Sequence, residues 1–297
     1  MTFTAFILVF ISVFMHAGWN FLGKKESPSA AFFLLAALAG TLFCLPFALC
    51  SGVDFFAIPL KFWWLLIISV LFNLVYFVAL ARGYRCGDIS LVYPLGRALP
   101  VLLTAIVTSL CGIGKDLSDC AFAGMVTVFA GCIIMPLQQW RDFKLKTYFS
   151  KVSLWILLIS IGTTGYTIFD SMDMEILKQI YFKNTILQAI FYMGAADALI
   201  TFGMFWIVIF SRNERRELMR ISRSYAPYIA GIFTASAYIL VLLAMNHVDN
   251  VCYIQAFRQM SLPVGMLAGV LILKESCSLP KIIGILLVIS GLIMTSL

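Results

Sequence analysis

Residues 185–210 read TILQAIFYMGAADALITFGMFWIVIF, and this stretch decides the fold class. It is long enough to cross the hydrocarbon core of a bilayer as an α-helix, which takes about 20 residues. Asp197 is its only charged residue. Similar apolar runs predict further spans at about 2–22, 29–50, 62–81, 89–111, 118–137, 153–170, 225–246, 251–273 and 279–296. The sequence therefore predicts an all-α integral membrane protein with ten transmembrane helices.

The composition of the whole chain leads to the same fold class. Of its 297 residues, 62% are hydrophobic and 12% are charged, whereas soluble domains are about one-quarter charged and a little under half apolar. The net charge of +7 does not indicate a nucleic-acid partner, because the basic residues lie between apolar spans. In that position they mark topology and contact lipid headgroups. We therefore expect the lipid bilayer, and no nucleic acid, as a partner.

Motifs for catalysis and cofactor binding are missing from the sequence. The eight cysteines form no CxxC pair and are accompanied by two histidines, so a structural metal site is not expected. The sequence contains neither a nucleotide-binding loop nor a Ser/His/Asp set. We expect no catalytic residues, no metal and no cofactor, and hence no enzyme. An ATP-driven pump is not expected either, unless a partner protein supplies the motor.

One of the longer connections between predicted spans covers residues 171–184, SMDMEILKQIYFKN. Met174, Leu177 and Tyr181 have helical spacing with charged residues between them, a pattern typical of a short helix that lies in the membrane interface. A plain loop fits the same residues equally well. The sequence leaves both alternatives open.

The two halves of the chain repeat each other weakly. Three residue pairs recur in the same order: Asp88/Arg97 with Asp249/Arg258, Gly124/Gly131 with Gly284/Gly291, and Gly18-Trp19 with Gly165-Tyr166. We assign residues 1–140 to a first five-helix repeat and residues 141–297 to a second. Because five is an odd number, the second repeat enters the membrane from the opposite side. The result is an inverted repeat, which many secondary transporters use.

Basic residues outside the spans gather on one side of this predicted topology. The strongest runs lie at residues 141–151 and 212–223. The positive-inside rule places these loops in the cytoplasm. The sequence therefore predicts a multi-pass protein of the inner (cytoplasmic) membrane with both termini outside.

Three stretches carry a resemblance to a known family. They are HAGWNFLGKK at residues 16–25, GDISLVYPLGRALPVLLTAI at residues 87–106, and RQMSLPVGMLAGVLILKESCSLPKIIGILLVISGLIM at residues 258–294. Together they resemble the EamA-type, ten-helix members of the drug/metabolite transporter superfamily. The resemblance implies an inverted-repeat transporter that moves small metabolites, often outward, by alternating access. Many members are thought to place both termini in the cytoplasm, whereas the charge distribution here indicates the reverse.

Asp197 is the most conspicuous ionisable residue inside a predicted span. A charge at the centre of a transmembrane helix costs about 2.5–3.5 kcal/mol on insertion scales, so such residues usually face a cavity or a partner. Asp197 could bind a proton or a cationic substrate. The alternatives are a structural ion pair with Arg97 or Arg258, or a span boundary misplaced by half a helix.

Arg97 and Arg258 occupy equivalent places in predicted helices four and nine. Two guanidinium groups that approach one cavity from opposite halves would suit a carboxylate or phosphate held bidentately. Alternatively, each side chain extends to the membrane interface or caps a neighbouring helix end.

Other polar and aromatic residues are candidates for the same cavity. His16, Trp19 and Asn20 share one face of the first helix, where they could relay protons or stack on a substrate. An interhelical hydrogen bond with an interfacial aromatic anchor is the alternative. As a group, further residues indicate a pocket near the midplane at the repeat interface: Asn73, Tyr76, Tyr93, Tyr166, Tyr238, Gln255 and Gln259.

Prolines and glycines in the predicted spans indicate flexibility and close packing. Pro94, Pro100 and Pro263 each remove a backbone hydrogen bond, which gives either a hinge for gating or a static kink. The paired glycines of helices five and ten, seven residues apart in each helix, would let these helices pack closely. The resemblance adds that the last helix of the small multidrug resistance proteins forms a dimer contact, so a homodimer is a candidate assembly.

These features together predict a secondary active transporter. We expect an exporter of a small polar metabolite or drug that works by alternating access, driven by protons or by exchange for a counter-substrate. A flippase for a lipid-linked carrier is the alternative. It would need an opening between helices towards the lipid.

Overall fold

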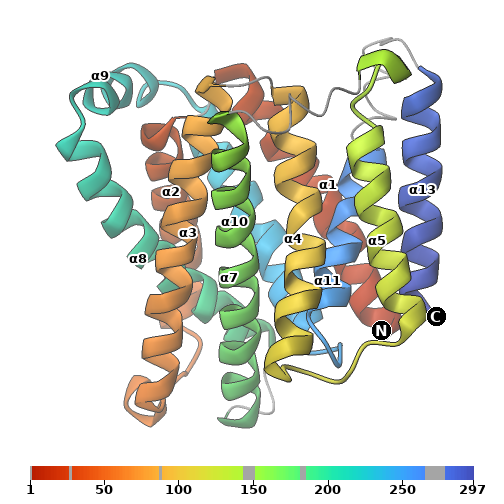
Figure 1. Cartoon of the computed structure of the whole chain (residues 1–297). Helices are drawn as coiled ribbons and strands as arrows, with labels where there is room; N and C mark the ends of the chain where they lie inside the picture. The colour runs from red at the N-terminus through yellow and green to blue at the C-terminus, as the bar shows by residue number, and fades with distance from the viewer. Residues whose placement is uncertain (1, 27–28, 87–88, 143–150, 181–184, 265–277) are drawn as a thin grey trace.

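The computed structural model describes residues 2–26, 29–86, 89–142, 151–180, 185–264 and 278–297. Within these ranges the chain is a bundle of helices with short connections (Figure 1). In the described part of the chain, seven helices contain a segment long and apolar enough to cross a membrane: α2 (Ala30–Leu49), α3 (Leu60–Cys86), α4 (Ile89–Cys111), α7 (Lys151–Ile180), α8 (Thr185–Phe210), α10 (Ala226–Met245) and α13 (Leu279–Ser296). The chain is thus an all-α, multi-pass membrane protein.

The remaining helices complete the bundle. Shorter apolar segments lie in α1 (Phe3–Glu26) and α5 (Asp119–Ile134). Of the predicted span 251–273, the described part consists of α11 (Cys252–Phe257), the 3-10 turn η3 (Arg258–Met260) and helical residues 261–264. The connections carry η1 (Phe55–Ala57), η2 (Trp140–Asp142) and α9 (Arg212–Ile221). Both termini lie at one end of the bundle, and α9 lies at the opposite end (Figure 1).

Local sequence signals explain where several helices begin. The Ser29 hydroxyl accepts a hydrogen bond from the backbone N–H of Phe32 at 3.1 Å and caps α2. Ser118 caps α5 in the same way, through the N–H of Ala121 at 3.1 Å. At the start of α13, Pro280 occupies the first turn, where its missing N–H leaves no hydrogen bond unmade. These three residues therefore define the first turns of α2, α5 and α13.

The helices pair mainly across the two halves of the chain. The closest pairs are α1 with α10, α2 with α8, α3 with α7 and α5 with α13. Helix α4 contacts α7, α5 and α11. The first and second halves therefore share one core.

The predicted close packing of helices five and ten is confirmed for α5 and α13. A Cβ atom at Gly124 would lie 2.6 Å from the carbonyl oxygen of Gly291, and one at Gly131 would lie 2.7 Å from that of Gly284. These distances are below any normal carbon–oxygen contact, so backbone meets backbone and only glycine fits.

The substitution Gly131→Leu is expected to destabilise the protein. The added side chain would separate α5 from α13, and overpacking of this kind costs about 1–3 kcal/mol. A loss of that size lowers the Tm of a chain this long by roughly 5 °C. The measurement is thermal unfolding in detergent, with Ala123→Leu as the control because Ala123 lies exposed on the same helix. An unchanged Tm for Gly131→Leu would contradict the packing.

Both predictions for residues 171–184 are wrong over the described part. Helix α7 continues without a break to Ile180, so the segment is neither a separate interfacial helix nor a loop. Met174 and Leu177 are completely buried because the apolar face of α7 continues past the charges that suggested the end of a span. Residues 181–184 lie outside the described ranges.

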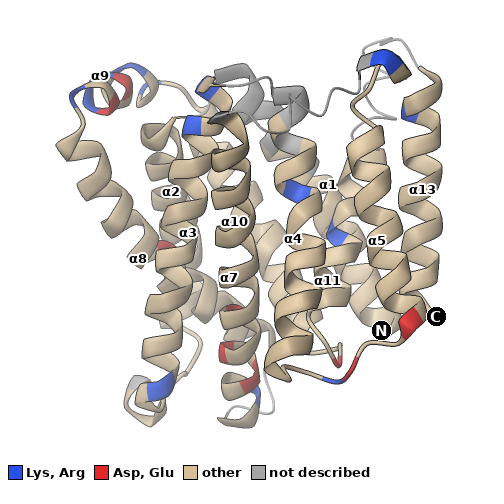
Figure 2. Cartoon of the chain, in the orientation of Figure 1, with Lys and Arg blue, Asp and Glu red and all other residues tan. Residues whose placement is uncertain are grey.

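Charged side chains are distributed unevenly along the bundle (Figure 2). Lysines and arginines predominate at the end that carries α9. There Glu214 of α9 is buried, accepts a hydrogen bond from the N–H of Ala31 at 3.1 Å and pairs with Arg85 at 2.7 Å. This carboxylate therefore joins α9 to the start of α2 and the end of α3.

Candidate functional site

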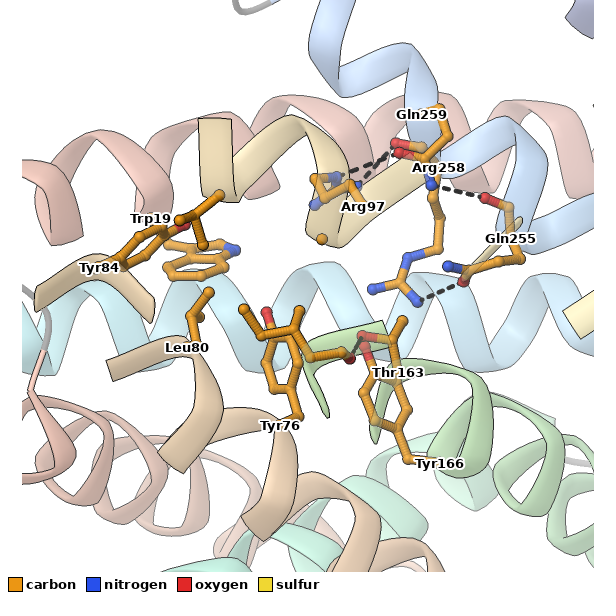
Figure 3. Close-up of a pocket in the computed structure, with 13 residues that line it drawn as sticks. Trp19, Tyr76, Leu80, Tyr84, Arg97, Thr163, Tyr166, Gln255, Arg258 and Gln259 are labelled. Atoms are coloured by element: carbon orange, nitrogen blue, oxygen red, sulfur yellow. Dashed lines mark hydrogen bonds between the residues drawn. The ribbon is translucent and has the colours of Figure 1, made fainter. Parts of the chain in front are cut away.

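A cavity lies inside the bundle, with about 800 Å³ of empty space when the solvent open to it is included. Its walls come from α1, α2, α3, α7, α8, α10 and η3, and its polar lining includes Asn73, Asp170, Asp197 and Arg258. Small-molecule sites are typically concave and carry a few polar groups among apolar side chains. An adjoining cavity, with about 430 Å³ of empty space including open solvent, shares some of these walls and is lined as far as Tyr84 (Figure 3). Tyr84 lies in the last turn of α3, near the end of the bundle that carries α9.

Most of the residues selected from the sequence line these two cavities. They are His16, Trp19, Asn73, Tyr76, Arg97, Tyr166, Asp197, Tyr238, Gln255, Arg258 and Gln259. The side chains of Asn20 and Tyr93 lie outside the described part of the structure. The lining comes from both halves of the chain, so the halves together form one enclosed site.

Arg97 of α4 holds the segment around Arg258 in place. Its Nη2 donates a hydrogen bond to the carbonyl oxygen of Arg258 at 3.0 Å, and its Nε donates to Oε1 of Gln259 at 3.4 Å (Figure 3). The two arginines thus meet, but not as a symmetric clamp. The guanidinium of Arg97 binds the backbone carbonyl of Arg258 and does not face a shared ligand together with the guanidinium of Arg258.

Arg258 is buried at the wall common to both cavities. Its Nη1 donates to Oε1 of Gln255 at 3.4 Å, and its guanidinium carbon lies 5.5 Å from the ring centroid of Tyr238. Within the described residues, its buried Nε meets no acceptor. An unpaired buried N–H is costly, and guanidinium N–H groups match carboxylate and phosphate oxygens. Arg258 is therefore suited to an anionic group in the cavity.

Asp197 of α8 is 7% exposed and faces the larger cavity. Its carboxylate packs against Gly40 of α2, where a Cβ atom would collide with it. Among the described residues, Asp197 forms no ion pair, so the alternative of a structural pair with Arg97 or Arg258 is wrong. The carboxyl group is available to a ligand.

The predicted patch on α1 is partly an intrahelical contact. The indole N–H of Trp19 donates to Nδ1 of His16 at 3.0 Å. In the neutral imidazole the proton then sits on Nε2. Both side chains line the larger cavity, so the hydrogen bond fixes their orientation towards it.

Three tyrosines form one aromatic wall. The ring centroids of Tyr76 and Tyr166 are 5.8 Å apart, and those of Tyr166 and Tyr238 are 5.9 Å apart, each pair edge to face. The rings come from α3, α7 and α10, so this preferred geometry ties three helices together. Their faces and hydroxyls are suited to contact a planar or cationic group.

The sequence analysis missed the polar centre of the site, Asp170 of α7. The hydroxyls of Ser69, Tyr192 and Tyr238, from α3, α8 and α10, all donate to its carboxylate, with Tyr192 at 2.6 Å. Asp170 had been placed at the end of a span. The regular spacing of Tyr166, Asp170, Met174 and Leu177 was the signal that the helix continues.

Comparisons with known proteins add the fold but no function. No protein-family model matches the chain, and no curated protein matches it. Among solved structures, a crystal structure of a protein whose description states no function matches with a TM-score of 0.64. It is 12% identical, and the match covers 98% of this chain and 97% of the other. The whole bundle is therefore a fold that occurs in an experimentally determined protein.

Proposed function

We propose that this protein is a secondary active transporter that exports a small polar metabolite or drug across the cytoplasmic membrane by alternating access. The observation that carries the proposal is the cavity that Asp197 and Arg258 both line. Among the described residues, Asp197 forms no ion pair and the Nε–H of Arg258 meets no acceptor. Ionisable residues within membrane-spanning helices are costly and usually mark a substrate or ion pathway.

The charges of the cavity favour an amphoteric solute. An anionic group of the solute would bind Arg258, and a cationic group would bind Asp197 beside the tyrosine wall. Both Asp197 and Arg258 would then have a partner of opposite charge, which matters because a buried charge without a partner is costly in a medium of low dielectric constant. The resemblance to EamA-type transporters supports the same class of function.

Helix contacts support the ten-span inverted repeat as part of this proposal. In each half, the five predicted spans correspond in order to α1, α2, α3, α4 and α5, and to α7, α8, α10, the segment beginning with α11, and α13. If each helix is replaced by its counterpart in the other half, the contact between α1 and α10 becomes the contact between α7 and α3, which is also present. The same exchange maps the α2–α8, α4–α11 and α5–α13 contacts onto themselves. Such pseudo-two-fold symmetry is typical of transporters whose substrate site lies between repeats.

The proposed orientation follows the basic residues. The end of the bundle that carries α9 (Figure 2) would face the cytoplasm, and both termini would lie outside. The smaller cavity extends to Tyr84 near that end. The opposite end is closed by contacts between the α4–α5 and α10–α11 connections.

Transport in proteoliposomes tests the proposal. Wild type is screened with pooled amphoteric compounds, organic acids and cationic drugs under an imposed pH gradient. We expect Asp197→Asn to reduce the flux of the transported compound at least about 10-fold, because the loss of one charge-assisted contact costs about 1.5–3 kcal/mol. Asp119→Asn, an exposed carboxyl group at the start of α5, is the matched control.

Equal flux in wild type, Asp197→Asn and Asp119→Asn would exclude Asp197 from the solute site. Absence of flux of any soluble compound, together with scrambling of a fluorescent lipid by wild type, would overturn this function and favour a flippase.

A further inference from the structure

A second carboxyl group lies one helical turn from Asp170 and is not part of the cavity lining. Asp173 of α7 is completely buried. Tyr192 lies beside it but donates its single hydroxyl proton to Asp170. Among the described residues, no donor meets either carboxylate oxygen of Asp173.

The hydrogen bonds distinguish the two acids sharply. Asp170 accepts from three hydroxyls, which is the environment of an ionised carboxylate. An ionised Asp173 would be a second negative charge, buried without a donor and adjacent to the first, and both features are strongly unfavourable. The pair therefore has the geometry to hold one proton, with that proton on Asp173.

The groups around the pair connect it to the cavity. On α7, Glu175 is exposed and Lys178 donates to the carbonyl oxygen of Asn246 at 3.3 Å, beyond the pair. From the packed helices, Ser69 of α3, Tyr192 of α8 and Tyr238 of α10 face Asp170. Tyr192 also lies beside Asp173. Arg258 lies over the ring of Tyr238, whose hydroxyl donates to Asp170. One tyrosine thus contacts both the acid pair and the guanidinium of the cavity.

The position of the pair along the bundle also suits a proton site. Seven residues separate Asp173 from the end of α7 at Ile180, which is about 10 Å at 1.5 Å per residue. That end carries both termini (Figure 1) and faces outward in the orientation proposed above. Asp173 therefore lies between the outer end of the bundle and the cavity.

From this arrangement we infer that Asp170 and Asp173 form the coupling site of the transporter, where one proton from outside binds as Asp173 O–H and is released inward in exchange for the exported solute. The inference rests on the proposed function. It moves the coupling proton away from Asp197, which then serves the solute. Release leaves two carboxylates, so it requires a conformation in which water or Arg258 reaches the pair.

Transport measurements separate this inference from the proposed function. Wild type, Asp173→Asn and Glu175→Gln are reconstituted, and two activities are measured: solute counterflow without a pH gradient, and accumulation driven by the gradient. We expect Asp173→Asn to keep counterflow within about twofold and to lose at least about 10-fold of the driven accumulation. Glu175→Gln, an exposed acid on the same helix, should match wild type in both.

Each other outcome overturns one claim. Absence of counterflow in wild type contradicts the transporter itself. Full gradient-driven accumulation by Asp173→Asn, or loss of both activities by the folded variant, contradicts the coupling role alone.

Thermal unfolding supplies a test that needs no substrate. Asparagine imitates a neutral carboxyl group, so Asp173→Asn should unfold within about 2 °C of wild type. Asp170→Asn should unfold at a clearly lower temperature, because three hydroxyls lose a charged acceptor. The reverse order of stability would show that the proton resides on Asp170, and would contradict the assignment.

Discussion

Replacing Arg258 with glutamine is expected to reduce transport about 100-fold. The guanidinium is buried, holds an unpaired Nε–H and lines both cavities. Glutamine keeps a hydrogen-bonding group but removes the charge that would bind an anionic part of the solute. Loss of a buried charge-assisted contact costs about 3 kcal/mol, which is roughly two orders of magnitude in affinity or rate.

The controls for this prediction separate charge from geometry. Arg258→Lys keeps the charge and loses the planar donor fork, so its flux should fall between those of wild type and Arg258→Gln. Arg141→Gln removes an exposed arginine from η2, away from the cavities, and should leave flux unchanged. Flux is measured in proteoliposomes at matched protein content. Near-normal flux by Arg258→Gln would exclude this residue from the solute site.

The second large effect is expected from a cross-link at the end opposite α9. There Lys115 pairs with Asp249 at 3.0 Å, and the N–H of Lys115 donates to the carbonyl oxygen of Asp249, also at 3.0 Å. Asn250 adds hydrogen bonds to the carbonyl oxygens of Ile113 and Lys115. In the proposed alternating-access cycle, these contacts must break when the cavity opens at this end of the bundle.

A disulfide between Lys115→Cys and Asp249→Cys would hold this end closed. The backbone hydrogen bond between the two positions brings their Cα atoms within the range that a disulfide can span. In a background without the native cysteines, oxidation is expected to reduce flux at least about 10-fold, and reduction should restore it. Each single-cysteine variant under the same oxidant is the control. Full flux in the cross-linked protein would mean that this end does not open during transport.

Sequence patterns alone were sufficient for the membrane class and for many of the residues that line the two cavities. Long apolar runs predicted the helices, because a bilayer requires every backbone group to be paired within its own segment. Charged residues inside those runs led to Arg97, Asp197 and Arg258, since each needs a cavity or a partner. The glycine pairs also predicted the close contact of α5 and α13.

Other features depended on packing that no local pattern reveals. The two charged residues Asp170 and Asp173 predict the end of a span, because charged side chains are unfavourable in a bilayer. Asp170 is nevertheless buried, because α3, α8 and α10 supply hydroxyls that donate to its carboxylate. Whether Arg97 would face a solute or the backbone of Arg258 was likewise undetermined, because the answer lies in a contact between residues 161 positions apart. The sequence shows which residues are charged or polar, but it does not show which residues they contact in the folded protein.

Uphill transport by the wild-type protein tests the central claim most directly. Proteoliposomes that contain the protein are loaded with equal concentrations of an amphoteric solute inside and outside, and a pH gradient is then imposed. We predict net movement of solute against its own developing concentration gradient, opposite in direction to the proton flow, and collapse of the accumulated gradient when a protonophore is added. If the solute stays equally distributed, or crosses only down its gradient, the protein is not a proton-driven secondary transporter of that solute class.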